Sequence, residues 1–277
     1  MNSEPGEALL NSFWRTLTRA PRRILLLDYD GTLAPFQTER DKACPYPEVT
    51  RLLTSIQNEP SCRLVIISGR AVDDLLPLLG MDPPPEIWGS HGLERRISNG
   101  RRELHPIDQS AMVALEQAAL WIEQKGLTEH CEQKPGCMAL HWRGLTPERE
   151  ARIRRNAEAD WPEIAAEGKL YIHLFDGGIE LRHPGRTKGD AVRTIIKEEE
   201  DAAAVAYLGD DATDEEAFRA VKARGLGILI RPERRPTAAQ IWLRPPDDLI
   251  AFLRKWCMIC KDRPDLPNEH NDVGGLK

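Results

Sequence analysis

The 277-residue chain lacks the features of several broad classes of protein. No apolar stretch approaches the roughly 20 residues needed to span a bilayer. The formal net charge of −6 argues against a general nucleic-acid binder, because such proteins present a basic face. Residues 1–23 carry acidic side chains early and have no continuous hydrophobic core, unlike a signal peptide. We therefore expect a cytoplasmic protein without a membrane or nucleic-acid partner.

The cysteines do not form a zinc-binding pattern. They are Cys44, Cys62, Cys131, Cys137, Cys257 and Cys260. The last two form a single CxxC, but no second pair of cysteines or of histidines lies at zinc spacing. In a chain of this size without an export signal, we expect all of them to remain reduced thiols.

Apolar runs typical of buried strands alternate with helical patterns in the first third of the chain. The strand-like runs cover 24–30, 62–70 and 86–94, and the helical patterns cover 48–57 and 72–80. The same alternation returns after residue 188, with strands over 204–211 and 226–230 and helices over 188–200 and 215–225. Such alternation predicts an α/β fold with a Rossmann-like parallel sheet between helices. An amphipathic helix is expected before it, since apolar residues recur at helical spacing between Leu9 and Leu17.

The middle of the chain has a different pattern. A hairpin signal at Asn99-Gly100 is followed by patterns for a helix over 111–126, two strands over 131–144, a helix over 146–164 and a hairpin over 169–183. We therefore predict an inserted α+β cap. The predicted parts are a helical segment (1–22), a core (23–107 and 184–260), the cap (108–183) and a loose C-terminal tail (261–277).

The first chemical motif is DYDGT, residues 28–32, at the end of an aliphatic strand. Alternation along a strand would send Asp28 and Asp30 to the same side. Two neighbouring carboxylates repel each other unless a cation lies between them, and Mg²⁺ prefers such ligands together with phosphate oxygens. One aspartate could then attack phosphorus while the other moves a proton. Gly31 would allow a tight turn and a close approach to phosphate.

A second acidic cluster follows another apolar strand, in GDDATDE at 209–215. The acidic start of a helix could account for Asp214 and Glu215, because carboxylates stabilise helix N-termini. It does not account for Asp210 and Asp211, which favour a cation site.

Two further residues are candidates for binding phosphate. Ser68 ends a strand ahead of free backbone amides, although a helix cap would explain it equally well. Lys188 lies at a predicted helix start, where it could neutralise phosphate and an attacking carboxylate; alone, it would be an ordinary surface lysine. The order and strand-end placement of all these motifs favour a phosphoryl-transfer site over separate structural roles.

With these motifs, the chain resembles the haloacid-dehalogenase superfamily, and within it the trehalose-6-phosphate phosphatases. The resemblance extends from about Arg23 to Leu253. It rests on LDYDGTLAP (27–35), ISGR (67–70), GSHGLE (89–94), EQKPGCMALHWR (132–143), GIELR (178–182), KG (188–189) and GDDATDEEAF (209–218). One departure is Pro135-Gly136-Cys137, where the family often has small polar residues.

The resemblance implies a role for each matching residue. Asp28 would be the nucleophile and Asp30 the general acid and base, while Ser68 and Lys188 would hold the phosphate. Mg²⁺ would be bound by Asp28, the backbone carbonyl of Asp30, and Asp210, with Asp214 acting through water. The substrate-binding residues would be Arg70, His91 and Gly92 from the core and Glu132, Lys134, His141, Arg143 and Glu180 from the cap.

The resulting hypothesis is an Mg²⁺-dependent phosphatase that converts trehalose 6-phosphate to trehalose through a phosphoaspartate. Two alternatives stay open: a phosphatase for a related sugar phosphate, such as sucrose phosphate or a glycosyl phosphoglycerate, and a catalytically silent sugar-phosphate sensor. The presence of both Asp28 and Asp30 weighs against the sensor, which needs no proton-transfer aspartate. Association with a trehalose-phosphate synthase is compatible with the sequence.

Overall fold

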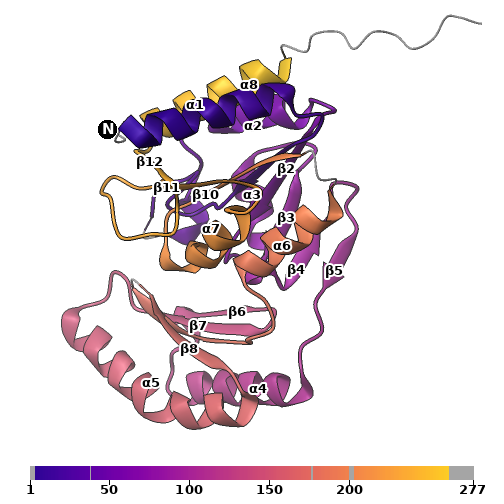
Figure 1. Cartoon of the computed structure of the whole chain (residues 1–277). Helices are drawn as coiled ribbons and strands as arrows, with labels where there is room; N and C mark the ends of the chain where they lie inside the picture. Colours follow the sequence, from indigo (N-terminus) through magenta and orange to yellow (C-terminus); the bar gives the residue numbers. More distant parts are fainter. Residues whose placement is uncertain (1–3, 38, 176, 200–202, 262–277) are drawn as a thin grey trace, which may run out of the picture.

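The computed structural model describes residues 4–37, 39–175, 177–199 and 203–261. Figure 1 shows a larger unit that carries the first and last described elements, and a smaller unit built from the middle of the chain. Within these ranges, none of the helices combines the length and the apolar character needed to cross a membrane.

The larger unit, the core, is built on an eight-stranded sheet in the order β12-β11-β10-β1-β2-β3-β4-β5. Its strands are β1 (Arg23–Leu27), β2 (Cys62–Ile67), β3 (Glu86–Gly89), β4 (Glu94–Arg96), β5 (Arg102–Leu104), β10 (Ala204–Gly209), β11 (Gly225–Ile230) and β12 (Ile241–Leu243). Neighbours from β12 to β3 are parallel, whereas β4 and β5 form an antiparallel hairpin, as predicted around Asn99-Gly100.

Helices cover both faces of this sheet, as the alternating pattern predicts. One face carries α1 (Glu4–Arg19), α2 (Val49–Gln57), α3 (Val72–Leu79) and α8 (Asp247–Lys261), and the other carries α6 (Lys188–Glu198) and α7 (Glu215–Val221). Side chains alternate along β1, so Leu25 and Leu27 pack with the first set and Ile24 and Leu26 with the second. Burial on both faces explains the unbroken apolar runs of the strands.

The expected N-terminal amphipathic helix is present as α1. Its Trp14 packs on Phe252 of α8, with ring centroids 4.7 Å apart. The ring centroid of Phe13 lies 6.0 Å from that of Trp256, in the same helix as Phe252. Of the predicted C-terminal tail, only Lys261 belongs to the described residues, where it ends α8; the rest lies outside them.

The smaller unit, the cap, has an antiparallel sheet in the order β6-β7-β9-β8. Its elements are α4 (Gln109–Gln124), β6 (Cys131–Lys134), β7 (Cys137–His141), α5 (Pro147–Gly168), β8 (Tyr171–Phe175) and β9 (Gly178–Arg182). The two helices lie side by side beneath the sheet in Figure 1 and enclose a second apolar cluster around Trp161. Thr146 caps α5 by accepting a hydrogen bond from the backbone N–H of Arg149, and Pro147 takes the first helical position.

The strands of the core end earlier than their apolar runs suggest. β1, β2 and β10 stop at Leu27, Ile67 and Gly209, so the polar residues that follow begin loops. Strand alternation therefore does not set the directions of Asp28 and Asp30, although both residues line the same cavity. Short 3-10 helices occupy four of the connections: η1 (Arg40–Lys42), η2 (Ser90–Gly92), η3 (Thr128–His130) and η4 (Ala212–Asp214).

Candidate active site

Four predicted site residues meet where β1 and β10 end beside the start of α6. Lys188 Nζ lies 2.6 Å from Asp28 Oδ1 and 2.8 Å from Asp214 Oδ1. All three side chains are buried, as is that of Asp210. Lys188 is fixed as the first residue of α6, whose N-terminus carries a reciprocal cap between Thr187 and the third helical residue. It is therefore not the surface lysine that its local sequence alone would favour.

Asp214 has a partner at each of its oxygens. Oδ1 accepts hydrogen bonds from Lys188 and from the hydroxyl of Tyr207, at 2.8 and 2.5 Å. Oδ2 accepts from the backbone N–H groups of Asp210 and Asp211, both at 2.9 Å. Asp214 thus holds both the lysine and the loop that follows β10 in place. Tyr207, a fully buried residue of β10, was not among the predicted site residues, because its place in an apolar run predicts only a buried strand residue.

The cluster carries an excess of negative charge in a buried place. Burial and the nearby Asp214 raise the pKa of Asp28 to about 7 although Lys188 opposes the shift. Burial, with Asp28 and Asp214 adding to it, raises the pKa of Asp210 well above its usual value. Burial alone would lower the pKa of Lys188, but Asp214 and Asp28 raise it above its normal range, so this lysine stays charged.

The donor set fits a hard divalent cation. Carboxylate oxygens of Asp28, Asp210 and Asp214 all lie within 4.8 Å of one another. One ammonium does not balance three carboxylates, and a cation would restore the balance. Because Asp214 is occupied by its four donors, Asp28 and Asp210 have the greater remaining capacity to bind metal. Gly31 (φ +78°) is required here, since a Cβ atom would fall 2.2 Å from Asp210 Oδ2.

Asp30 and Arg70 form a two-pronged ion pair at the cavity. Arg70 Nε and Nη2 donate to the two carboxylate oxygens of Asp30 at 2.7 and 2.6 Å. The pair joins the predicted proton-transfer residue to a predicted substrate-binding residue. Ser68 is buried beside it, and its hydroxyl accepts a hydrogen bond from the backbone N–H of Arg70 at 3.1 Å. It does not cap α3, the alternative left open by the sequence, because the residue at the start of that helix is Ala71.

His91 lies in a strained turn between core and cap. Ser90 and His91 both adopt left-handed conformations, with φ of 48° and 56°, which cost of order 1–3 kcal/mol per residue. The imidazole Nε2 is 3.8 Å from Glu180 Oε1 of the cap. Burial lowers the pKa of His91 well below its usual value, and the positive charges of the nearby Arg182 and Lys134 add to this effect. The ring is therefore neutral at physiological pH.

Gly92 has a different position from that expected of a substrate-binding residue. It is not among the residues that line the cavity, and a Cβ atom on it would lie 3.1 Å from the carbonyl oxygen of Thr187. With φ of +102°, this glycine lets the turn that carries His91 pack closely against the start of α6.

The predicted cap residues meet on the face that looks toward the core. Glu132 Oε2 lies 3.0 Å from His141 Nε2 and 3.4 Å from Lys134 Nζ. Lys134 also donates to the backbone carbonyl of Gly69 in the core, at 3.2 Å. The cap therefore touches the core through a lysine that belongs to its own cluster of polar side chains.

The turn between β6 and β7 provides another cap–core contact. Gly136 (φ +65°) accepts a hydrogen bond from the backbone N–H of His183 at 2.7 Å, and a Cβ atom on it would lie 2.6 Å from Leu93 Cδ1. The Pro-Gly-Cys departure from the family pattern thus places a glycine where the cap rests on the core.

A cavity of about 600 Å³ separates the two units above these clusters. It is lined by most of the predicted residues: Asp28, Asp30, Arg70, His91, Glu132, Lys134, His141, Arg143, Glu180, Lys188 and Asp210. Ser68, Gly92 and Asp214 lie behind this lining. Asp211, which the sequence favoured as part of a cation site, also lines the cavity. The sequence interpretation missed further lining residues: Phe36, Gln37, Gly69, His173, Leu174, Phe175, Ala212, Thr213 and Arg231.

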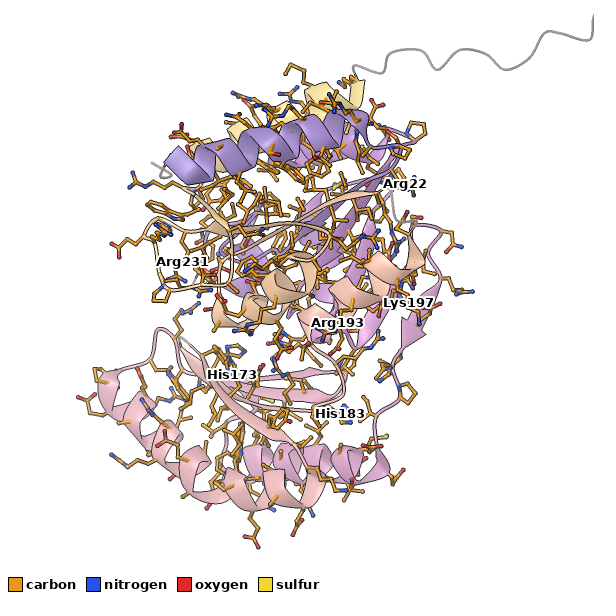
Figure 2. The ribbon with its side chains drawn as sticks, viewed as in Figure 1. Arg22, His173, His183, Arg193, Lys197 and Arg231 are labelled. Atoms are coloured by element: carbon orange, nitrogen blue, oxygen red, sulfur yellow. The ribbon has the colours of Figure 1, made fainter. Side chains whose placement is uncertain are left out.

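Two of the missed residues approach the cavity from opposite sides. Figure 2 labels His173 on β8 of the cap and Arg231 just after β11 of the core, on either side of the boundary between the units. Arg231 Nη1 lies 3.3 Å from the carbonyl oxygen of Asp210. Alternation along β8 puts His173 and Phe175 on one face, a signal that could have identified them.

The parallel sheet, the aspartates that follow β1 and β10 and the inserted cap define a haloacid-dehalogenase-like hydrolase fold. A haloacid-dehalogenase-like hydrolase from B. subtilis superimposes with a TM-score of 0.56 at 14% identity, covering 83% of this chain and 98% of that one. These features confirm the predicted α/β Rossmann-like fold with a cap.

The sequence model of the trehalose-phosphatase family matches residues 26–246, so the chain belongs to that family. The trehalose-phosphate phosphatase of Mycobacterium marinum is 32% identical over 246 residues, covering 84% of this chain and 60% of that protein. The C-terminal domain of the C. albicans trehalose-6-phosphate phosphatase has a TM-score of 0.73 at 20% identity, covering 90% of this chain and 96% of that one. The chain spans 60–65% of the length of its first curated relatives.

Proposed function

We propose that the protein hydrolyses trehalose 6-phosphate to trehalose and phosphate through a phosphoaspartate on Asp28. The observation that carries this proposal is the Asp28–Lys188 contact of 2.6 Å at the floor of a cavity walled by both units. The cavity volume of about 600 Å³ is within the usual range for small-molecule sites. The family membership supports the choice of sugar phosphate.

Asp28 is the nucleophile in this proposal. Its carboxylate oxygen attacks phosphorus, and the bond between phosphorus and the sugar oxygen breaks. The charged ammonium of Lys188 favours the ionised form of Asp28 and offsets charge on the phosphoryl group. Ser68, buried at the end of β2, supports the phosphate from the adjacent loop.

Asp30 moves the protons. It donates one to the departing sugar oxygen, and later accepts one from the water that attacks the phosphoaspartate and releases phosphate. In the structure its carboxylate is engaged by Arg70. An incoming phosphate would compete for Arg70, and we infer that this competition releases Asp30 to take up a proton.

Mg²⁺ is the proposed cofactor, supported by the buried carboxylates of Asp28 and Asp210 and by the fixed loop around Asp214. The carbonyl oxygen of Asp30 would complete the protein ligands. When bound, the ion would neutralise charge on the phosphoryl oxygens and on the attacking carboxylate.

The cap residues are proposed to bind the sugar. Glu132, His141 and Lys134 supply acceptors and donors on one face, and His91 and Glu180 approach from the boundary with the core. Such convergent polar groups can orient a disaccharide over the phosphate site.

The test is phosphate release from a panel of sugar phosphates, in Mg²⁺ and in chelator, for the wild type and Asp28→Asn. We expect selective turnover of trehalose 6-phosphate that disappears with chelator and falls at least about 10³-fold in the variant. Glu129→Gln, an exposed change elsewhere in the cap, serves as the control.

The other results separate the remaining hypotheses. Selective turnover of a different sugar phosphate would keep the mechanism and reject the substrate. Tight sugar-phosphate binding without release of phosphate would favour the sensor. Undiminished turnover by Asp28→Asn would reject the nucleophile.

A further inference from the structure

Two cysteines far apart in sequence meet inside the core. Cys62 is the first residue of β2, and Cys260 lies in the last turn of α8. Their sulfur atoms are 2.7 Å apart although 198 positions separate the two residues. Both side chains are buried, with 8% and 1% of their surface exposed. All six cysteines belong to the described residues, and among these no other pair of cysteine sulfurs is in contact.

The pair lies at the amino-terminal end of a central strand, opposite the candidate active site. Cys62 begins β2, whereas Ser68 follows the end of the same strand. In Figure 1, α8 runs next to α1 on the side of the core away from the cap. The two thiols therefore take no part in the proposed phosphatase chemistry.

We propose that Cys62 and Cys260 form a redox-sensitive site in which a peroxide converts the two thiols into a disulfide. A disulfide bond is about 2.05 Å long, so the sulfur atoms need to approach by well under an ångström. The bond would tie the last turn of the helix to the start of a central strand. As the last turn of α8, the segment around Cys260 can open without unfolding the sheet, which gives a small oxidant a route to the pair.

The chemistry balances with hydrogen peroxide as the oxidant. The Cys62 thiolate attacks one peroxide oxygen, the O–O bond breaks, and the departing hydroxide takes a proton to become water. The resulting sulfenic acid condenses with the Cys260 thiol, forming the S–S bond and releasing a second water. The two sulfurs together lose two electrons and two hydrogens, and the peroxide is reduced to water.

The surroundings distinguish the two thiols. The hydrogen bond with Cys260 lowers the pKa of Cys62, and the positive charge of Arg23 adds to this effect while burial opposes it. The pKa of Cys260 is raised by the same contact and by burial. Cys62 is therefore the attacking thiolate, and Cys260 is the thiol that resolves the sulfenic acid.

The disulfide would close a loop that runs from β2 to α8 and contains the whole cap, which constrains the unfolded chain strongly. We expect oxidation to raise the Tm by about 5–10 °C. Phosphatase turnover at 25 °C should change little, because the pair lies at the end of β2 opposite the candidate active site.

The test treats the full chain with hydrogen peroxide and compares the wild type, Cys260→Ser and Cys257→Ser. Cys257 provides a matched control because it is a buried cysteine of the same helix without a cysteine partner. Non-reducing peptide mapping should show that the peptides containing residues 62 and 260 are linked, with a mass two hydrogens below the sum of the two peptides. The Tm should rise in the wild type and in Cys257→Ser, fall back with dithiothreitol, and stay unchanged in Cys260→Ser.

Three results would overturn the proposal: no linked peptide, a link found only between two chains, or Cys62 oxidised to the sulfinic acid with Cys260 left as a thiol. If Cys260→Ser does not fold, Cys62→Ala replaces it, and a Tm rise in that variant would count equally against the disulfide.

Discussion

The floor and the roof of the cavity are built in different ways. On the floor, Asp28, Lys188 and Asp214 are buried and joined by short contacts, and they lie just after β1, at the start of α6 and at the end of η4. On the roof, the cap sheet presents His141 and His173, partly exposed, and its edge strand β8 leaves Tyr171 61% exposed. The proposed function accordingly assigns the chemistry to the floor and substrate recognition to the roof.

This contrast follows from the two sheets. A parallel sheet covered by helices on both faces fixes its strand ends, so Lys188 and the carboxylates that it contacts need no rearrangement during the proposed phosphoryl transfer. The cap sheet has helices on one face only, and its other face forms the cavity wall. Changes on the floor should therefore affect chemistry and stability, and changes on the roof should affect recognition.

The largest expected effect is that of Lys188→Met on the floor. Removing the ammonium leaves Asp28 and Asp214 buried without their cation, which costs about 3–5 kcal/mol of stability and lowers the Tm by about 10 °C. Turnover should fall at least about 10³-fold, because the charge that supports the nucleophile is lost. Thermal unfolding and phosphate release measure both. A variant with normal stability and turnover would show that the floor does not depend on this lysine.

The next effect concerns Tyr207, which touches the floor only through Asp214. Tyr207→Phe removes one hydroxyl and leaves the ring in its packing site against Phe218. We expect kcat to fall about 10-fold, since a buried hydrogen bond to a charged group is worth about 1.5–3 kcal/mol. KM should stay constant. A change in KM alone would mean that Tyr207 affects binding and does not position the catalytic groups.

On the roof, Glu132→Gln is expected to raise KM for trehalose 6-phosphate about 10-fold, because one charged hydrogen bond is weakened. Turnover of a small aryl phosphate, which cannot reach the cap, should be unaffected. Comparing kcat/KM for the two substrates tests the division between floor and roof. Equal losses for both substrates would place Glu132 in the chemistry and erase the distinction.

Residue patterns alone predicted parts of the floor, because strand ends are local signals, whereas the candidates on the roof came from the family resemblance. An aliphatic run followed by aspartates predicts where carboxylates gather, and Asp28 and Asp210 do meet in the structure. The direction of each side chain was less predictable. Asp30 lies beyond the end of β1 and pairs with Arg70, and no pattern in the chain encodes that pairing across 40 positions.

Tyr207 and Arg231 show the limits of sequence reasoning in another way. Tyr207 resembles any other apolar residue of a buried strand, and only the packing of η4 beneath it brings Asp214 within reach of its hydroxyl. Arg231 follows β11 and donates to the carbonyl oxygen of Asp210, which follows the neighbouring strand β10. The first contact depends on how the chain turns after β10, and the second depends on the pairing of β10 with β11. Residue patterns specify neither.

The smallest expected effect is a pH dependence confined to the floor. Burial raises the pKa of Asp28 to about 7, far above the value of about 3.9 in an unfolded chain. Between these values the folded, metal-free protein holds a proton that the unfolded chain has lost, so stability falls as pH rises through about 4 to 7.

The variant Asp28→Asn cannot ionise at this position. In chelator, the Tm of the wild type should therefore drop a few degrees more than that of Asp28→Asn between pH 5 and pH 8. Mg²⁺ should remove the difference by stabilising the ionised carboxylate. Parallel melting curves for the two proteins would mean that the Lys188 charge alone keeps Asp28 ionised, and that the floor is balanced without a metal.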